Sequence, residues 1–223
     1  MDLSAAQESG LRRLFEAARR TKFYRQWLRE IRQPLTATLD LLPHIEPFRF
    51  DEDSRTFLNR GASAPRVRPL RYPLPLPKKA NILAASIQEL RRLASTPKPQ
   101  EYPVVAFTGI RHGALTQADR DLLWRAFRVP VFEQFRGLHG ELLAEECEAH
   151  DGLHVIGEAA IFERRGQDLV ATSLLALRTP VLRVLTGVTG EIDGGLCPCG
   201  RPGERLLSVA PKPLAMRKAA GAR

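Results

Sequence analysis

Cysteine is scarce in this chain of 223 residues, which contains only three. Three cysteines in a chain of this length do not make a disulfide framework, so they indicate reduced thiols or a metal site. Long apolar runs are absent too, since none approaches the roughly 18 residues of a membrane span. The start, MDLSAAQESG, has neither the basic nor the apolar region of a signal peptide. These absences predict a cytoplasmic protein that does not use a membrane.

Positive charge is lacking in the middle of the chain, although the formal net charge is +9. Lys and Arg outnumber Asp and Glu by 19 to 10 in residues 1–100 and by 6 to 1 in residues 201–223, but acids lead by 14 to 9 in residues 101–200. A basic total is typical of nucleic-acid-binding proteins, but the distribution matters more than the total. An excess at both ends fits solvated termini better than a shaped groove, so nucleic acid is the least favoured partner class.

The first 42 residues have helical periodicity. Apolar side chains recur every three or four residues before Pro34, which indicates one amphipathic helix or a pair. The aromatic residues Phe23, Tyr24 and Trp27 follow the same spacing, and we interpret them as core rather than as ligand contacts. Residues 43–80 are rich in proline and predict an extended connector, because the alternating prolines of PLPLP do not match the PxxP pattern of SH3 ligands.

The centre of the chain predicts a parallel βαβ unit. The stretch SIQEL carries a capping-box pattern that opens a short helix. The run YPVVAFTG at 102–109, a helical pattern at 116–127 and the run VPVFEQF at 129–135 then read as strand, helix and strand. Ligands gather at the carboxyl ends of such strands. This places TGIRHG and FRGLHGE where a ligand would bind.

The carboxyl half predicts mainly strands. After Cys147, the runs LHVIGEAAIFE, DLVATSLL and PVLRVLTG are short, apolar and separated by turns. Just before them, the acids Glu141, Glu145, Glu146 and Glu148 form a charge run that we interpret as a solvated helix face. No serine lies in a nucleophile-elbow pattern, so we assign no catalytic triad.

The order of several stretches resembles the phenylacetate–coenzyme A ligase family, a branch of the adenylate-forming enzymes. The stretches are KFYRQWL and TLDLLPHI near the start, LTQADRDLLWRAFRVPVFEQF in the middle, and then EECEAHDGLHV, LVATSLL, TPVLRVLTG and CPCGR. Together they span most of the chain. The resemblance implies an adenylate-forming α/β fold, binding of ATP or AMP, and acid–thiol ligation.

The chain departs from the motifs that carry adenylation in this family. The phosphate loop, which resembles SSGTTGKP in the family, reads NRGASAPR here, and Pro65 removes an amide donor that a phosphate cradle needs. The motif resembling YGxTE reads FRGLH, so His139 replaces a magnesium-binding glutamate although magnesium prefers oxygen ligands. The motif resembling RxxTGD reads RVLTGV, so Val188 replaces the aspartate that holds the ribose.

The family also ends in a mobile domain that supplies a lysine to the adenylating centre. Only 22 residues follow CPCGR here, and we expect neither Lys212 nor Lys218 to be catalytic. We therefore assign no catalytic residue. His112 and His139 lie on the expected ligand loops and either contact an anionic ligand, act as acid and base, or are solvated. The nucleotide-binding positions that the resemblance implies are Gly109, Gly137, His139, Arg183, Thr186 and Gly187.

All three cysteines fall within the stretches that resemble the family. Cys147, Cys197 and Cys199, with His154 of GLHV as the fourth ligand, make a Cys₃His set that is familiar for structural zinc. The CPC spacing is less diagnostic than C-x-x-C. The alternative is three buried reduced thiols beside a strand histidine whose hydrogen bonds are satisfied.

We therefore expect an α/β fold with amino-terminal helices, a parallel βαβ core resembling part of an adenylate-forming large domain, and a β-rich carboxyl part with a zinc site. The expected division is 1–42 helical, 43–80 connector with the altered phosphate loop, 81–211 core, and 212–223 basic tail. The function expected is that of a non-ligating relative that binds a nucleotide or acyl ligand weakly or serves as an accessory protein. The alternatives are an active ligase completed by a second chain, which would supply the missing elements, and a basic zinc-stabilised module that binds nucleic acid.

Overall fold

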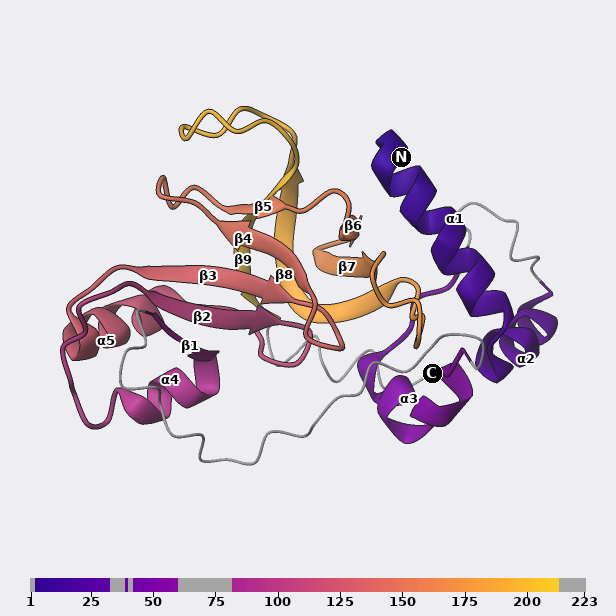
Figure 1. Ribbon diagram of the computed structural model, residues 1–223, viewed down its shortest axis with the longest axis horizontal. Coiled ribbons are helices and arrows are strands. Elements are labelled where there is room, and N and C mark those ends of the chain that lie inside the picture. The colour runs from indigo at the N-terminus through magenta and orange to yellow at the C-terminus, as the bar shows by residue number, and fades with distance from the viewer. Residues whose placement is uncertain (1–2, 33–38, 40–41, 60–81, 213–223) are drawn as a thin grey trace.

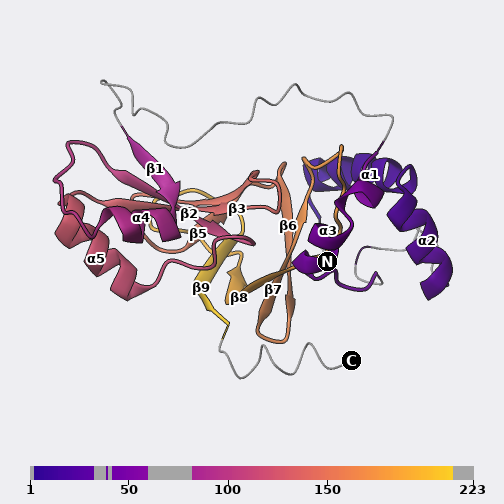
Figure 2. The ribbon, with the colours of Figure 1, turned by 90° about the horizontal axis from the view of Figure 1, so that it is seen from below.

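One twisted sheet of nine strands runs through the molecule and is flanked by helices at both ends. The structure is a computed structural model that describes residues 3–32, 39, 42–59 and 82–212. Helices α4 and α5 lie at one end and α1, α2 and α3 at the other (Figure 1), and the view from below shows the same separation (Figure 2). The sheet order is β1-β2-β3-β4-β5-β9-β8-β7-β6. The strands are β1 (Leu83–Ser86), β2 (Val104–Gly109), β3 (Val131–Arg136), β4 (Leu142–Glu146), β5 (Leu153–Val155), β6 (Ala160–Arg165), β7 (Asp168–Ser173), β8 (Val184–Asp193) and β9 (Arg205–Pro211).

The amino-terminal helices form because each begins at a capping residue and presents one apolar side. Ser4 and Gln7 make a reciprocal capping box at the start of α1, and Thr21 caps α2. The pair that the periodicity allowed is therefore confirmed. Tyr24 and Trp27 are 0% and 5% exposed, which confirms that they are core residues. The helices are α1 (Ala5–Arg19), α2 (Lys22–Ile31), α3 (Pro47–Glu52) and the 3₁₀ turn η2 (Ser54–Phe57).

The predicted βαβ unit is confirmed and is extended by one more strand. Strands β1, β2 and β3 are parallel neighbours, with Val104 opposite Val131 in the second pair. Helix α4 (Ile87–Leu93) connects β1 to β2, and α5 (Gln117–Phe127) connects β2 to β3. A reciprocal capping box between Thr116 and Asp119 opens α5. The core below these helices consists of small and branched side chains from β1 to β3 and the apolar sides of α4 and α5.

The remaining six strands pair antiparallel, as expected for a β-rich carboxyl half. Strand β9 lies between β5 and β8, so it brings the end of the described chain against β5, where Leu206 lies opposite Leu153. Gly152 permits the close approach of β5 to β9, because its φ is +84° and a Cβ there would lie 2.7 Å from the Leu206 carbonyl oxygen. This packing positions the loop between β8 and β9.

The interpretation of the acidic run as a solvated helix face is wrong. Leu142–Glu146 is strand β4, and Glu146 is only 8% exposed. Its carboxylate accepts hydrogen bonds from Arg120 of α5, at 2.9 and 3.2 Å, and from the backbone N–H of Glu133, at 2.8 Å. A buried charge with these partners is stable in a strand. The partners are distant in sequence, so the local charge pattern did not reveal the strand.

Several sequence predictions fall outside the described residues. These are residues 60–66 of the altered phosphate loop, the PLPLP stretch and Lys218. Lys212 is described, and its ammonium lies 2.7 Å from a carboxylate oxygen of Asp168. In the part of the chain that the structure describes, no helix is both long and apolar enough to cross a membrane.

Candidate functional site

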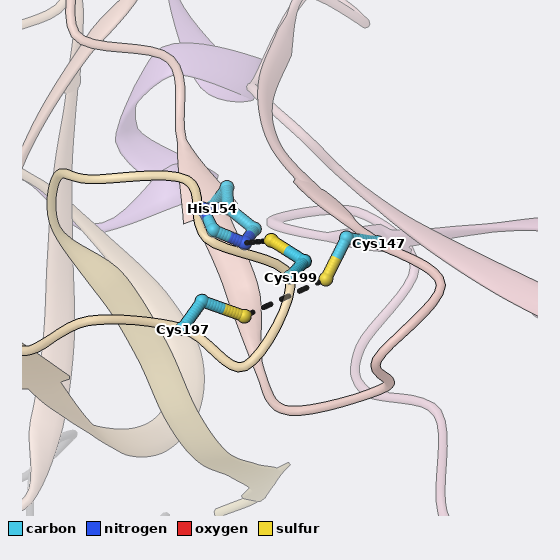
Figure 3. A group of neighbouring side chains, drawn as sticks. All are labelled: Cys147, His154, Cys197 and Cys199. Atoms are coloured by element: carbon cyan, nitrogen blue, oxygen red, sulfur yellow. Dashed lines mark hydrogen bonds between the residues drawn. The ribbon is translucent and has the colours of Figure 1, made fainter.

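The four residues of the predicted Cys₃His set come together in space (Figure 3). Cys147 follows β4 directly, and His154 lies on β5, which pairs with β4. Cys197 and Cys199 come from the loop between β8 and β9. The three sulfur atoms and the imidazole Nε2 point toward one another between the β4–β5 region and the β8–β9 loop. The predicted constellation is therefore present as a geometric cluster.

The distances within the cluster fit a tetrahedral metal site. All four ligand atoms lie within 4.8 Å of one another. The Sγ atoms of Cys147 and Cys197 are 3.7 Å apart, and Cys199 Sγ is 3.4 Å from His154 Nε2. Zinc–sulfur bonds of about 2.3 Å in a tetrahedron place two sulfurs about 3.8 Å apart. The sulfurs are too far apart for a disulfide, which needs about 2.05 Å.

Burial and electrostatics also suit metal ligands. Cys147 and Cys197 are 2% and 3% exposed, and His154 is 7% exposed. Burial lowers the pKa of His154, and the charges of Arg201 and Arg205 lower it further. This keeps the imidazole in the neutral form that binds metal. Burial raises the pKa of Cys147, whereas the backbone N–H of Arg201 lowers the pKa of Cys199.

Two arginines next to the cysteines have their own acidic partners. Arg205, on β9, pairs with Asp151 and Asp193 at 2.6 Å each. Arg201 lies 3.5 Å from Glu148. The positive charges of both arginines are therefore compensated by carboxylates beside the cluster. Around the cysteines, Arg201 and Arg205 thus lie in specific ion pairs with acidic side chains.

The loops at the carboxyl ends of β2 and β3 lie directly against each other. Gly109 has a φ of +110°, and a Cβ there would lie 2.2 Å from the carbonyl oxygen of Arg136. Only glycine fits this contact. Gly137 is buried, and its N–H donates to the Glu141 carbonyl at 2.8 Å. Arg111 joins the two loops by donating to the Leu138 carbonyl at 2.9 Å.

The two loop histidines have different environments. His139 is exposed, and its Nε2 lies 3.0 Å from both the carbonyl and the hydroxyl oxygen of Thr179. Its ring also packs edge-on against Phe50. His112 is half-buried, and burial together with the charges of Arg111 and Arg136 lowers its pKa. Neither histidine is within a metal cluster of the described residues.

The remaining predicted positions lie at the start of β8. Arg183 is 7% exposed and donates to the Glu163 carboxylate at 2.8 and 3.0 Å, with a further bond to the Leu42 carbonyl. Thr186 donates to the Leu169 carbonyl at 2.7 Å. Gly187 is exposed with a φ of +75°, and Val188 is fully buried in the core.

Sequence reasoning missed a buried polar network between α5 and the sheet. Thr108 donates to Glu133 at 2.7 Å, and Arg120 lies 3.4 Å from the same carboxylate. Burial raises the pKa of Glu133 to about 7, although the Thr108 bond and Arg120 oppose the rise. Period-2 alternation in VFEQF would have placed Glu133 on the same side as Phe135, which is a signal for an inward-facing acid.

Comparison with solved structures relates this fold to part of an adenylate-forming acyl-CoA ligase. One similar structure is 2-hydroxyisobutyryl-CoA ligase in the postadenylation state, in complex with R3-HIB-AMP, with a TM-score of 0.66 and 14% identity. The match covers 91% of this chain and 67% of the ligase. An open conformation of that ligase, with 2-HIB-AMP and CoA, matches with a TM-score of 0.46 and 17% identity, over 57% of this chain and 32% of the other. No protein-family model and no curated protein matches the chain.

Proposed function

We propose that this chain is a non-ligating relative of the acyl-CoA ligases, of the phenylacetate–coenzyme A ligase type, whose carboxyl part is fastened by structural zinc. In this proposal it binds a nucleotide or acyl ligand weakly at the loops after β2 and β3, or acts as an accessory protein. The fold similarity to 2-hydroxyisobutyryl-CoA ligase supports the ligase-like scaffold. The chemistry of the motif positions supports the lack of efficient ligation.

The observation that carries the proposal is that side chains at the motif positions are engaged inside the protein. Arg183 is bound to Glu163, and Val188 is buried in the sheet core. His139 is bound to Thr179 and carries no carboxylate for magnesium. A group that is committed to an internal partner has to break that contact before it can hold a ligand. Weak binding follows, because that cost subtracts from the affinity.

Adenylation needs several preorganised contacts at once. Triphosphate positioning, a magnesium ligand and ribose anchoring each stabilise charge or geometry in the transition state. Losing one such contact commonly costs about a hundredfold in rate or more. The magnesium and ribose positions are occupied here by His139 and Val188. Their combined loss supports a protein without efficient ligase activity.

The zinc in this proposal has a structural role. Cys147, His154, Cys197 and Cys199 would supply all four ligands of a tetrahedral site, which leaves no open position for water or substrate. Zinc at such a site would add its binding free energy to the free energy of folding, because the four ligands come together only in the folded chain. These four residues join the end of β4 and strand β5 to the loop before β9.

The test is ATP–pyrophosphate exchange with a panel of aryl and acyl acids. We expect no exchange above background, while calorimetry detects weak nucleotide binding that His139→Asn reduces and His150→Asn, on a histidine outside these loops, leaves unchanged. Robust exchange by the chain alone would contradict the proposal. Exchange that requires a neighbouring gene product would instead favour the alternative of a ligase completed by a second chain.

A further inference from the structure

The exposed sides of α1 and α2 carry a dense set of cations. Residues 3–32 contain eight arginines and lysines but only three acids, Glu8, Glu16 and Glu30. All eight cations are exposed, because the apolar sides of both helices pack into the core. We call them the α1–α2 basic surface: Arg12, Arg13, Arg19, Arg20, Lys22, Arg25, Arg29 and Arg32.

The cations of the α1–α2 basic surface share the lack of an ion pair with some other described cations, such as Arg128 and Arg178, but all eight lie within one short stretch of the chain, residues 12–32. Within the described residues, none of the eight lies in an ion pair. Eight other arginines and lysines of the described chain do pair with carboxylates. They are Arg91, Arg92, Arg111, Arg120, Arg183, Arg201, Arg205 and Lys212.

Part of the basic surface is ordered along one side of α2. Lys22, Arg25 and Arg29 are three and four residues apart, so they follow one another on the same side. With Gln26 they line a surface groove of about 570 Å³. The Nε atoms of Arg25 and Arg29 donate to backbone carbonyls of α2 and its cap at 3.2 and 2.9 Å. These bonds fix the guanidinium groups and leave their terminal nitrogens for an anion.

We propose that the α1–α2 basic surface docks the phosphate backbone of double-stranded DNA. Seven of its eight cations are arginines, whose planar guanidinium binds phosphate with two parallel hydrogen bonds. Neutralising phosphates releases counterions, which drives binding that does not depend on sequence. The surface lies at the end of the molecule opposite α4 and α5 (Figures 1 and 2), and it is separate from the zinc cluster. This role goes beyond the proposed ligand binding.

Two observations favour a duplex over the other polyanions. An anionic membrane surface takes up helices that also insert large apolar side chains. The exposed large apolar residues of the described chain all lie outside α1 and α2. Single-stranded nucleic acid is held by exposed aromatic rings on which bases stack. Tyr24 and Trp27 are buried, and the ring of Phe23 is stacked on that of Phe57 with their centroids 3.9 Å apart. The described part of this surface therefore has no fully exposed ring.

The test compares two triple variants in binding to a labelled DNA duplex, measured by fluorescence anisotropy at several salt concentrations. One combines Lys22→Gln, Arg25→Gln and Arg29→Gln. The matched control combines Lys98→Gln, Arg125→Gln and Arg164→Gln, which removes the same charge from exposed residues elsewhere. We expect the first variant to bind at least about tenfold more weakly and its logarithmic salt slope to fall by about 2 to 3, because each lost phosphate contact contributes about 0.9. The control should match the wild type.

Four outcomes would overturn the proposal. These are the absence of salt-sensitive duplex binding, equal weakening by both triple variants, tighter binding to a single strand of the same sequence, and tighter binding to phosphatidylserine vesicles. Thermal unfolding of both variants accompanies the titrations. The substituted side chains are exposed, so their unfolding temperatures should stay close to that of the wild type, and a titration is scored only for folded protein.

Discussion

Two histidines lie near the three cysteines, but only one of them has its side chain in the cluster. His154 is one of the four residues of the Cys/His cluster, whereas His150, only four residues earlier, points to Glu146, with Nδ1 3.0 Å from its carboxylate. The two histidines therefore make a matched pair. They share a residue type and a neighbourhood but differ in contact with the cysteines.

The first prediction is that His154→Gln removes zinc while His150→Gln retains it. Because a structural zinc site is part of the folding free energy, loss of one ligand should also lower the melting temperature by several degrees or more. Elemental analysis of protein purified without chelator measures the metal, and calorimetry measures the melting. Equal zinc content in the two variants would count against His154 as a ligand.

The second prediction concerns Glu133, which is 4% exposed. Burial raises its pKa from about 4.5 to about 7 in the folded state, so the folded protein holds a proton that the unfolded chain has released. The stability that this proton contributes is present below about pH 4.5 and is lost as the pH rises through 7. Arg120, Thr108 and Glu146 face this carboxyl group.

Urea unfolding of the wild type and Glu133→Gln between pH 5 and pH 8 measures this effect. The free energy of unfolding of the wild type should fall by about 2 kcal/mol relative to the variant over this range. Glu191→Gln, an exposed acid of β8, serves as a control that should follow the wild type. Parallel curves for wild type and Glu133→Gln would show that Glu133 titrates normally in the folded protein.

Residue identities predicted the metal cluster better than they predicted the buried acids. Cysteine is rare here, and thiols with a nearby histidine have few structural uses, so Cys147, Cys197 and Cys199 pointed to one site. Glu146 was misread because a buried carboxylate depends on its partner, and that partner, Arg120, is 26 residues away. An ion pair between residues so far apart in sequence cannot be predicted from the charge pattern around Glu146 alone.

At the scale of elements, α2 is attached to the sheet through one buried hydroxyl group. The Tyr24 oxygen accepts a hydrogen bond from the backbone N–H of Leu182 at 2.7 Å, just before β8. Burial raises the pKa of Tyr24 well above its ordinary value, so the hydroxyl stays protonated. The ring also packs edge-on against Trp27 and Phe57. Helix α2 and strand β8 are therefore coupled.

The third prediction is that Tyr24→Phe destabilises the protein by about 1 to 3 kcal/mol, because it leaves the buried N–H of Leu182 without its acceptor. Tyr102→Phe removes a hydroxyl from a side chain that is 44% exposed and should change stability by less than about 0.5 kcal/mol. Denaturant unfolding compares the two. If both variants matched the wild type, the bond to Leu182 would not hold α2 in solution.

Elements with a local signal were predictable, and those that depend on distant pairing were not. Helix α5 followed from its apolar spacing and its capping residues, and β2 and β3 followed from their apolar runs. Strand β9 has no comparable signal, since RLLSVAP lies in a proline-rich end and is ordered by pairing with β5 and β8. The burial of Glu146 on β4 likewise depends on Arg120 of α5.

In the whole molecule, the Cys/His cluster joins two parts of the sheet that are distant in sequence. Cys147 and Cys197 are 50 residues apart, and the loop of Cys197 and Cys199 precedes β9. The fourth prediction is that a strong chelator loosens β4, β5 and β9 while β2 and α5 keep their protection. Hydrogen exchange resolved by segment measures this, and a uniform change across the sheet would contradict it.

We propose that Cys147, His154, Cys197 and Cys199 bind a zinc ion that holds this ligase-like fold together. Zinc X-ray absorption on protein purified without chelator tests it most directly. We expect one zinc per chain, bound by three sulfurs at about 2.3 Å and one nitrogen at about 2.0 to 2.1 Å. A stoichiometry well below one, or a shell dominated by oxygen, would contradict it.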